Sequence, residues 1–185
     1  MEMYLIIVGI IGLVIVLLYN TLISKKNQVD NIFASLDAIL KKRYDLLPNL
    51  VASVQEYMIH EKSTLEKVTQ LRVSAMQSGL GSEAKIELDN KFSQMLSGLM
   101  VSVENYPTLK ANENFLHLQH TLNELEEQIS AARRAYNQSV TDYNNAIEMF
   151  PTNIMANFMK LEHKILFAIV EHERQNVDVK NIFQK

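Results

Sequence analysis

The chain of 185 residues is 48% hydrophobic, which is enough for one domain with a buried core and a small appendage. Its net charge of −3 argues against nucleic acid as a partner, because phosphate binding needs a cationic surface. The absence of cysteine excludes disulfides, thiolate catalysis and cysteine-bound metal, while the scarcity of glycine and proline leaves room for long helices.

The first predicted element is a membrane anchor within residues 1–24. Residues 3–23 carry no charge, and as a helix they would extend about 30 Å, the thickness of a bilayer core. A buried core helix and a cleaved signal peptide are the alternatives. The run is apolar on every side, no Lys or Arg precedes it and no small-x-small cleavage site follows it, so we predict an uncleaved anchor. Because Lys25 and Lys26 come directly afterwards, the positive-inside rule predicts an outside N-terminus and a cytoplasmic remainder.

Residues 25–150 show helical periodicity, with apolar side chains three and four residues apart. Breaks are predicted at Pro48, Pro107 and Pro151 and at the glycine-containing residues 78–82. The longest regular stripe follows Pro107 and keeps a heptad pattern with one four-residue stutter. We therefore predict an all-α chain in which a single transmembrane helix precedes a long up-and-down antiparallel four-helix bundle.

The stretch LKKRYDLLPNLV (40–51) is interpreted as the joint between the first two bundle helices. Pro48 suits the first turn of the second helix, and Leu47 is the expected bend, because a residue before proline avoids the helical region. Asp45 could cap or stabilise the new helix N-terminus through its charge. A continuous helix with a proline kink is the alternative, because the apolar stripe continues through Leu47 to Val51.

The third segment, residues 151–185, is predicted to be an amphipathic helix followed by a polar tail. Residues 154–170 are rich in apolar side chains, and Lys160 and Lys164 lie among them. The helix could pack on the bundle, or it could contact lipid with its two lysines near anionic headgroups.

Several long motifs resemble the LemA family of bacterial membrane proteins, and they run almost from end to end of the chain. They include LKKRYDLLPNLV (40–51), ENYPTLKANENFLHLQ (104–119), EEQISAARRAYNQSVTDYNNAIEMFP (126–151) and VDVKNIF (177–183). The resemblance implies a membrane helix, a four-helix bundle and a place in a bacterial inner membrane. MamQ, a magnetosome-membrane protein, looks like a relative, which implies roles in membrane organisation. The resemblance implies no catalytic residue. The segment after Pro151 is more apolar than the family pattern and lacks its glycine, which favours a helix there.

Two histidines are the main candidates for metal chemistry. His117 and His120 form a row with Glu113 and Glu124 on one helix face, which could bind zinc weakly or could simply be a solvated surface. The sequence lacks a zinc-protease motif, a phosphate loop and a serine nucleophile elbow. We therefore expect no enzyme activity and no cofactor.

Charged residues interrupt or flank the apolar stripes. Asp37, Arg43 and Glu61 occupy such positions. Long side chains there could lie along the edge of the core with their charges in water. Alternatively, Arg43 could meet a carboxylate on a neighbouring helix in a polar network that fixes the register.

Arg133 and Arg134 flank the stripe of the last bundle helix. They could form partly exposed ion pairs with Glu126 or Glu127, or provide a surface for an acidic partner or lipid headgroup.

The sequence thus favours a non-enzymatic, membrane-anchored scaffold or interaction module at the inner membrane face. Its expected partners are the membrane and proteins not identified by the sequence, with a second copy of the chain as one candidate. One alternative is a membrane-organisation or envelope-stress protein whose C-terminal helix contacts lipid. An alternative of another class is a metal-binding bundle that uses the His117/His120 row.

Overall fold

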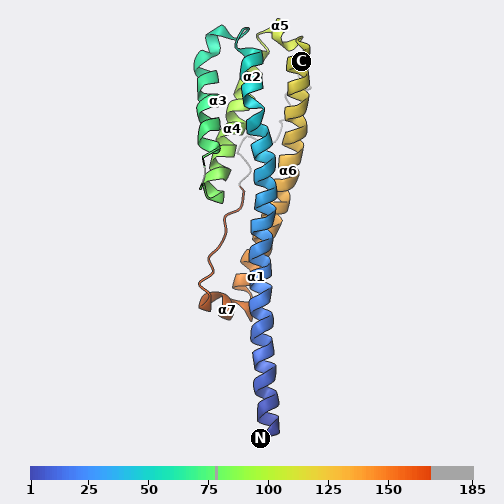
Figure 1. The fold of residues 1–185 in the computed structure, drawn as a ribbon, viewed down its shortest axis with the longest axis vertical. Coiled ribbons are helices and arrows are strands. Elements are labelled where there is room, and N and C mark those ends of the chain that lie inside the picture. The colour runs from blue at the N-terminus through green and yellow to red at the C-terminus, as the bar shows by residue number, and fades with distance from the viewer. Residues whose placement is uncertain (78, 168–185) are drawn as a thin grey trace, which may run out of the picture.

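The computed structural model describes residues 1–77 and 79–167, and in these residues it is helical without strands. The helices are α1 (Glu2–Asp45), α2 (Leu47–Val54), α3 (Lys62–Ala75), α4 (Ser82–Val103), α5 (Pro107–Lys110), α6 (Glu113–Glu148) and α7 (Thr152–Phe158), with a short 3-10 turn η1 (Ile59–Glu61) before α3. Figure 1 shows the up-and-down bundle, in which α1 runs beside α6 and α3 beside α4. The predicted all-α fold is confirmed.

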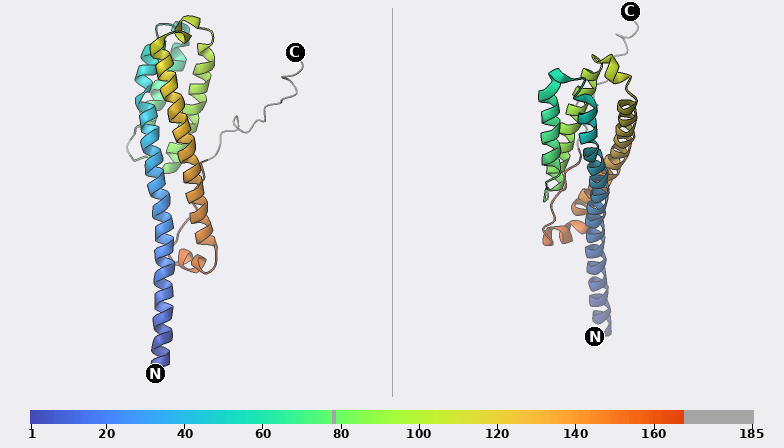
Figure 2. Two further views of the ribbon diagram at one scale, coloured as in Figure 1. Left: turned by 90° about the vertical axis from the view of Figure 1, so that its right-hand side faces the viewer. Right: turned by 45° about the horizontal axis from the view of Figure 1, so that its top comes forward.

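The N-terminal part of α1 projects from the bundle as a single rod (Figure 2). Its side chains are exposed as far as residue 17, and Leu22 is the first to be fully buried. This helix is long and apolar enough to cross a membrane, and its exposure excludes a core helix. The predicted anchor boundary at residue 24 falls inside α1, where the helix continues without a break.

The core follows a heptad pattern on the two longest helices. On α1, Leu22, Val29 and Leu36 are buried at seven-residue intervals. On α6, nine apolar side chains are buried: Phe115, Leu118, Leu122, Leu125, Ile129, Tyr136, Val140, Tyr143 and Ile147. This spacing keeps one face of each helix turned towards its neighbour, which explains why α1 and α6 pack along their lengths.

At residues 45–48 the structure has a brief interruption between two helices instead of the predicted helix–helix joint. The interruption falls at Leu46 rather than Leu47, and Leu46 keeps a right-handed helical conformation, with φ −80° and ψ −15°. Pro48 does lie in the first turn of α2. Asp45 does not cap α2, which has no side-chain cap, and it lies 3.9 Å from Arg72 of α3. The alternative, that its charge stabilises the start of α2, stays a prediction. The chain therefore continues its direction here, close to the kinked-helix alternative.

The chain actually reverses between Gln55 and Glu61, a region the sequence analysis assigned to the interior of the second bundle helix. No proline or glycine marks this turn. It is held by contacts with distant residues: Met58 is fully buried, and the Tyr57 hydroxyl accepts a hydrogen bond from the Asn112 side chain at 3.4 Å. Tertiary packing thus selects a turn that local sequence does not signal.

The predicted amphipathic helix over 154–170 was wrong over most of the described part. Helix α7 ends at Phe158, Lys160 adopts a left-handed φ of 51°, and residues 161–167 turn back along the bundle as a non-helical segment, here called the strap (Figure 1). The predicted polar tail, 171–185, lies outside the described residues.

Asparagine side chains on α6 replace the missing helical hydrogen bonds of the strap. Asn144 accepts from the Lys164 N–H and donates to the Lys164 carbonyl, both at 3.0 Å. Asn137, seven residues earlier, makes the same two contacts with Phe167, at 2.7 and 2.9 Å. Buried or half-buried backbone groups must be paired, and these side chains pair them without helix formation.

Candidate functional site

A buried charge network joins α1, α4 and α6. Its first member, Arg43, occupies the heptad position that follows Leu36 on α1, and only 2% of its surface is exposed. Its guanidinium donates to Asp89 at 3.3 Å and to Ser93 at 3.2 Å, both on α4, and its other terminal nitrogen lies 3.0 Å from Glu126 on α6.

Asp89 is the centre of the network and is fully buried. Its second carboxylate oxygen accepts a hydrogen bond from Arg133 of α6, and the Tyr44 hydroxyl lies 3.5 Å from the first oxygen. Arg133 also approaches Glu126, at 3.9 Å. Two arginines thus face two carboxylates, so the charges of the cluster balance.

Aromatic rings complete the surroundings of the two arginines. The Arg43 guanidinium lies over the Phe92 ring, 4.6 Å from its centre, and Tyr44 meets the same ring edge-on. Arg133 lies over Phe167 of the strap at the same distance. Each cation therefore gains a π-face contact in addition to its carboxylates, and Arg133 also links α6 to the strap.

The network lowers the cost of burying charge but does not remove it. The Nε groups of Arg43 and Arg133 are buried and have no hydrogen-bond partner among the described residues. The pKa of Tyr44 lies well above its usual value, first because the hydroxyl is buried and second because Asp89 is negatively charged nearby. Asp89 itself is closed to solvent and ties three helices together, so the arrangement can fix the helix register, while Glu126 keeps contact with water.

The other predicted site residues lie outside this network, each with a contact of its own. Asp37 accepts from Lys85 of α4 at 2.6 Å, Glu61 lies 3.4 Å from the Thr64 hydroxyl, and the exposed Arg134 donates to Ser130 at 2.9 Å. Of the residues singled out in the sequence, the structure brings together Arg43 and Arg133.

The histidine row does not form a metal site in the described residues, where no three metal-binding side chains converge. His120 and Glu124 lie 3.6 Å apart, and both are exposed. The pair is an ordinary surface contact within one helix.

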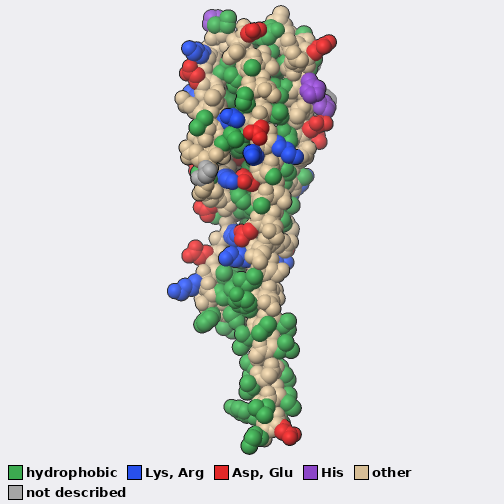
Figure 3. Space-filling model, viewed as in Figure 1, with side chains coloured by type: hydrophobic (Ala, Val, Ile, Leu, Met, Phe, Trp, Pro, Cys, Tyr) green, Lys and Arg blue, Asp and Glu red, His purple; other side chains and the backbone are tan. Residues whose placement is uncertain are grey.

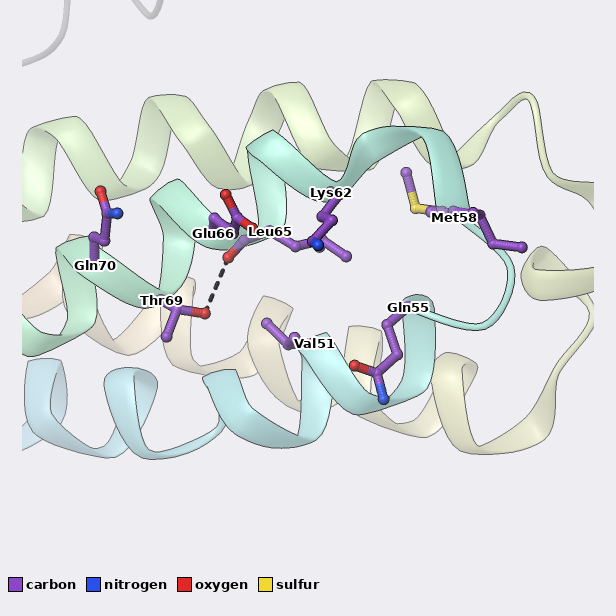
Figure 4. A pocket seen from close by; sticks show the side chains of 9 residues that line it. Val51, Gln55, Met58, Lys62, Leu65, Glu66, Thr69 and Gln70 are labelled. Carbon is purple, nitrogen blue, oxygen red and sulfur yellow. Dashed lines mark hydrogen bonds between the residues drawn. The ribbon is translucent and has the colours of Figure 1, made fainter.

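An open groove of about 580 Å³ lies between α2 and α3 near the end of the bundle away from the anchor. Figure 4 shows side chains of both helices facing this space. Its lining is mixed: Val51 and Leu65 are apolar, and Gln55, Lys62 and Glu66 are polar or charged.

Sequence reasoning missed Asp89 and the two strap-binding asparagines. A signal was present for each. Asp89 lies three residues after Ile86 and three before Phe92, on the apolar stripe of its helix. The dipeptide Tyr-Asn occurs twice on α6, at 136–137 and 143–144, one heptad apart and therefore on one face.

We expect Asp89→Ala and Arg43→Ala each to lower the free energy of unfolding by about 3–5 kcal/mol, because each leaves opposite charges buried without a partner. The double variant should cost less than both single changes together, since the second change removes a group that the first left unpaired. Urea unfolding of the full chain in mild detergent, followed by circular dichroism, measures these values.

Lys91→Ala is the control, because Lys91 pairs with Glu87 on the exposed face of α4. It should change stability by less than about 1 kcal/mol. Strictly additive effects of Arg43→Ala and Asp89→Ala would show that the two side chains are not coupled.

Stability should also decrease at alkaline pH. A tyrosine with a raised folded-state pKa keeps its proton while the unfolded chain loses it above pH 10, so the free energy of unfolding falls by about 1.4 kcal/mol per pH unit for one such group. Tyr136 and Tyr143 act in the same direction, because burial raises their pKa values too. Tyr44→Phe should therefore make the decline above pH 10 less steep, as measured by urea unfolding at several pH values. Equal slopes would contradict the buried state of the hydroxyl.

The chain is similar to several known bacterial proteins. Protein LemA of Metamycoplasma hominis is 29% identical over 175 residues, which cover 95% of this chain and 80% of the relative. Magnetosome protein MamQ 2 of Paramagnetospirillum magneticum is 23% identical over 163 residues, which cover 75% of this chain and 60% of the relative. Magnetosome protein MamQ of Magnetospirillum gryphiswaldense is 22% identical over 173 residues, which cover 78% of this chain and 64% of the relative.

The chain thus spans less than two thirds of the length of these MamQ proteins. The family model described as the LemA family matches residues 32–181, which include every member of the buried network. This match extends over most of the chain, and the chain therefore belongs to the LemA family.

Proposed function

We propose that the protein is a non-enzymatic, membrane-anchored scaffold that holds protein partners at the inner face of a bacterial membrane. The observation that carries this proposal is the continuity of α1, which runs for 44 residues from the apolar anchor into the bundle. At about 1.5 Å per residue the helix is about 66 Å long. A flexible linker would let the bundle rotate freely, whereas a continuous helix holds it upright at a fixed height.

The charged groups of the core support a structural role. Arg43, Asp89, Arg133 and Glu126 are paired with one another, and the carboxylate at their centre is closed to solvent. The groove between α2 and α3 offers both polar and apolar side chains, among them Gln55 and Val51. These features suit a rigid body that presents surfaces to other proteins.

The bundle is proposed to face the cytoplasm. Lys25 and Lys26 lie directly after the anchor, and no Lys or Arg precedes it. Because positively charged flanks stay on the cytoplasmic side during insertion, the N-terminus would lie outside.

The lack of cysteine allows this orientation to be tested with single-cysteine variants. We expect Glu2→Cys to react with a membrane-impermeant maleimide on intact cells, and the exposed Lys67→Cys to react only after the cells are opened. Both variants should react equally in detergent, which controls for accessibility. Labelling of Lys67→Cys on intact cells would reverse the proposed orientation.

The scaffold role can be tested by photo-crosslinking in the native membrane. A benzophenone amino acid at Gln70, which lines the groove, should capture one or a few defined proteins. The same group at the exposed Asn114, at the start of α6, is the control and should not capture them. Thr69→Trp, which fills the groove, should abolish the capture at Gln70. Identical products at Gln70 and Asn114, or none at either, would argue against a partner at the groove.

A further inference from the structure

A cluster of exposed apolar side chains lies where α6 turns into α7. Its members are Met149, Phe150, Ile154 and Phe158, and they are called the apolar foot here. Their exposed fractions are 62%, 79%, 65% and 86%. Single exposed apolar residues are ordinary, but a contiguous group of this kind marks an interaction surface.

The position of the foot indicates what covers it. Helix α7 packs on α1 and lies beside the part of α1 where the free rod begins (Figure 1). Leu22 is the first fully buried residue of α1 and lies at the end of the uncharged run 3–23. The foot is therefore at the height where the anchor would leave the hydrocarbon core of a bilayer.

The figures agree with this placement. Both views in Figure 2 and the view in Figure 1 show α7 as the element nearest to the free rod of α1. In Figure 3, hydrophobic side chains gather around α7 beside the equally apolar rod. The two apolar surfaces are continuous, so a bilayer that surrounds the rod would also reach the foot.

The strap does not cover the foot, because it is bound to residues 136–144 of α6, nearer the middle of the bundle. Tyr143 donates to the Glu162 carbonyl at 3.1 Å and Tyr136 to the Ile165 carbonyl at 3.2 Å. These contacts direct the chain away from α7 immediately after the foot ends, and they leave its apolar side chains open.

The charges around the foot also suit a lipid surface. Lys26 and the exposed Lys160 lie at this end of the bundle, near the anionic headgroups of a cytoplasmic leaflet. The acids at this end are Glu148, which lies 2.5 Å from the His163 ring, and the exposed Glu162, while Asp30 and Asp142 are paired with Lys164 and Lys25.

We propose that the apolar foot inserts into the interface of the same membrane that α1 crosses. The protein would then be attached at two points, by a spanning helix and by a short interfacial turn. Two attachments restrict both the tilt of the bundle and its rotation about α1. This inference rests on the proposed anchor, and the experiment below separates the two.

The chain contains no tryptophan, so an introduced tryptophan is a unique fluorescent reporter. Full-length Phe158→Trp and Phe150→Trp would be reconstituted into vesicles of phosphatidylcholine and phosphatidylglycerol, with and without brominated phosphatidylcholine as a quencher. Leu13→Trp, inside the anchor, is the positive control. Leu116→Trp, an exposed apolar position at the far end of the bundle, is the matched negative control.

We expect both foot variants to show blue-shifted emission that brominated lipid quenches, as in Leu13→Trp, while Leu116→Trp stays unquenched. Foot variants that behave like Leu116→Trp, while Leu13→Trp is quenched, would overturn the inference and leave the anchor intact. A blue shift that brominated lipid does not quench, and that becomes smaller when the protein is diluted in lipid, would also overturn the inference. It would show that a second copy of the chain covers the foot. An unquenched Leu13→Trp would overturn the anchor, and the foot with it.

Discussion

The buried carboxylate of Asp89 constrains the arrangement of the other bundle helices. It receives Arg43 from α1 and Arg133 from α6, so three helices meet at one pair of oxygen atoms. A shift of any one helix by a single turn, about 5.4 Å, would leave a charge buried without a partner. Apolar contacts at heptad spacing tolerate several registers, whereas this cluster is satisfied in only one. The ion pairs therefore contribute more to the choice of register than to net stability.

A fixed register in the bundle matters because α1 also belongs to the membrane. The heptad stripe that begins at Leu22 faces α6 and α7, while the same helix a few turns earlier is exposed on all sides. Any rotation of α1 imposed by packing in the bundle is transmitted to the anchor, because no break separates them. The network would thus set which faces of the molecule lie towards the membrane, including the α6–α7 corner proposed to insert into it.

Sequence periodicity predicted the all-α fold, the long apolar N-terminal helix and the up-and-down bundle, because these depend on local spacing and on hydrophobicity. It located a charged position on the stripe at Arg43 but could not choose between an edge position and a network, since that choice depends on the helix opposite. The partner, Asp89, interrupts its own stripe in the same way, so two interruptions on separate helices could have been matched. The turn at residues 55–61 gave no such signal, because it is held by Met58 and Tyr57 through contacts made only in the folded chain.

The strap shows why an apolar segment need not become a helix. Residues 161–167 have the composition of an amphipathic helix, but a helix pairs its own backbone groups and gains nothing from Asn137 and Asn144. As a non-helical strap, the chain uses both asparagines and both tyrosines of α6 and places Phe167 over the guanidinium of Arg133. That last contact adds a π-face to an arginine already held by Asp89, so the strap covers the Arg133 side of the buried network. Folding of the C-terminal segment and burial of the charge cluster are therefore coupled, and the helix ends at Phe158 because the bundle offers the following residues better partners than their own backbone does.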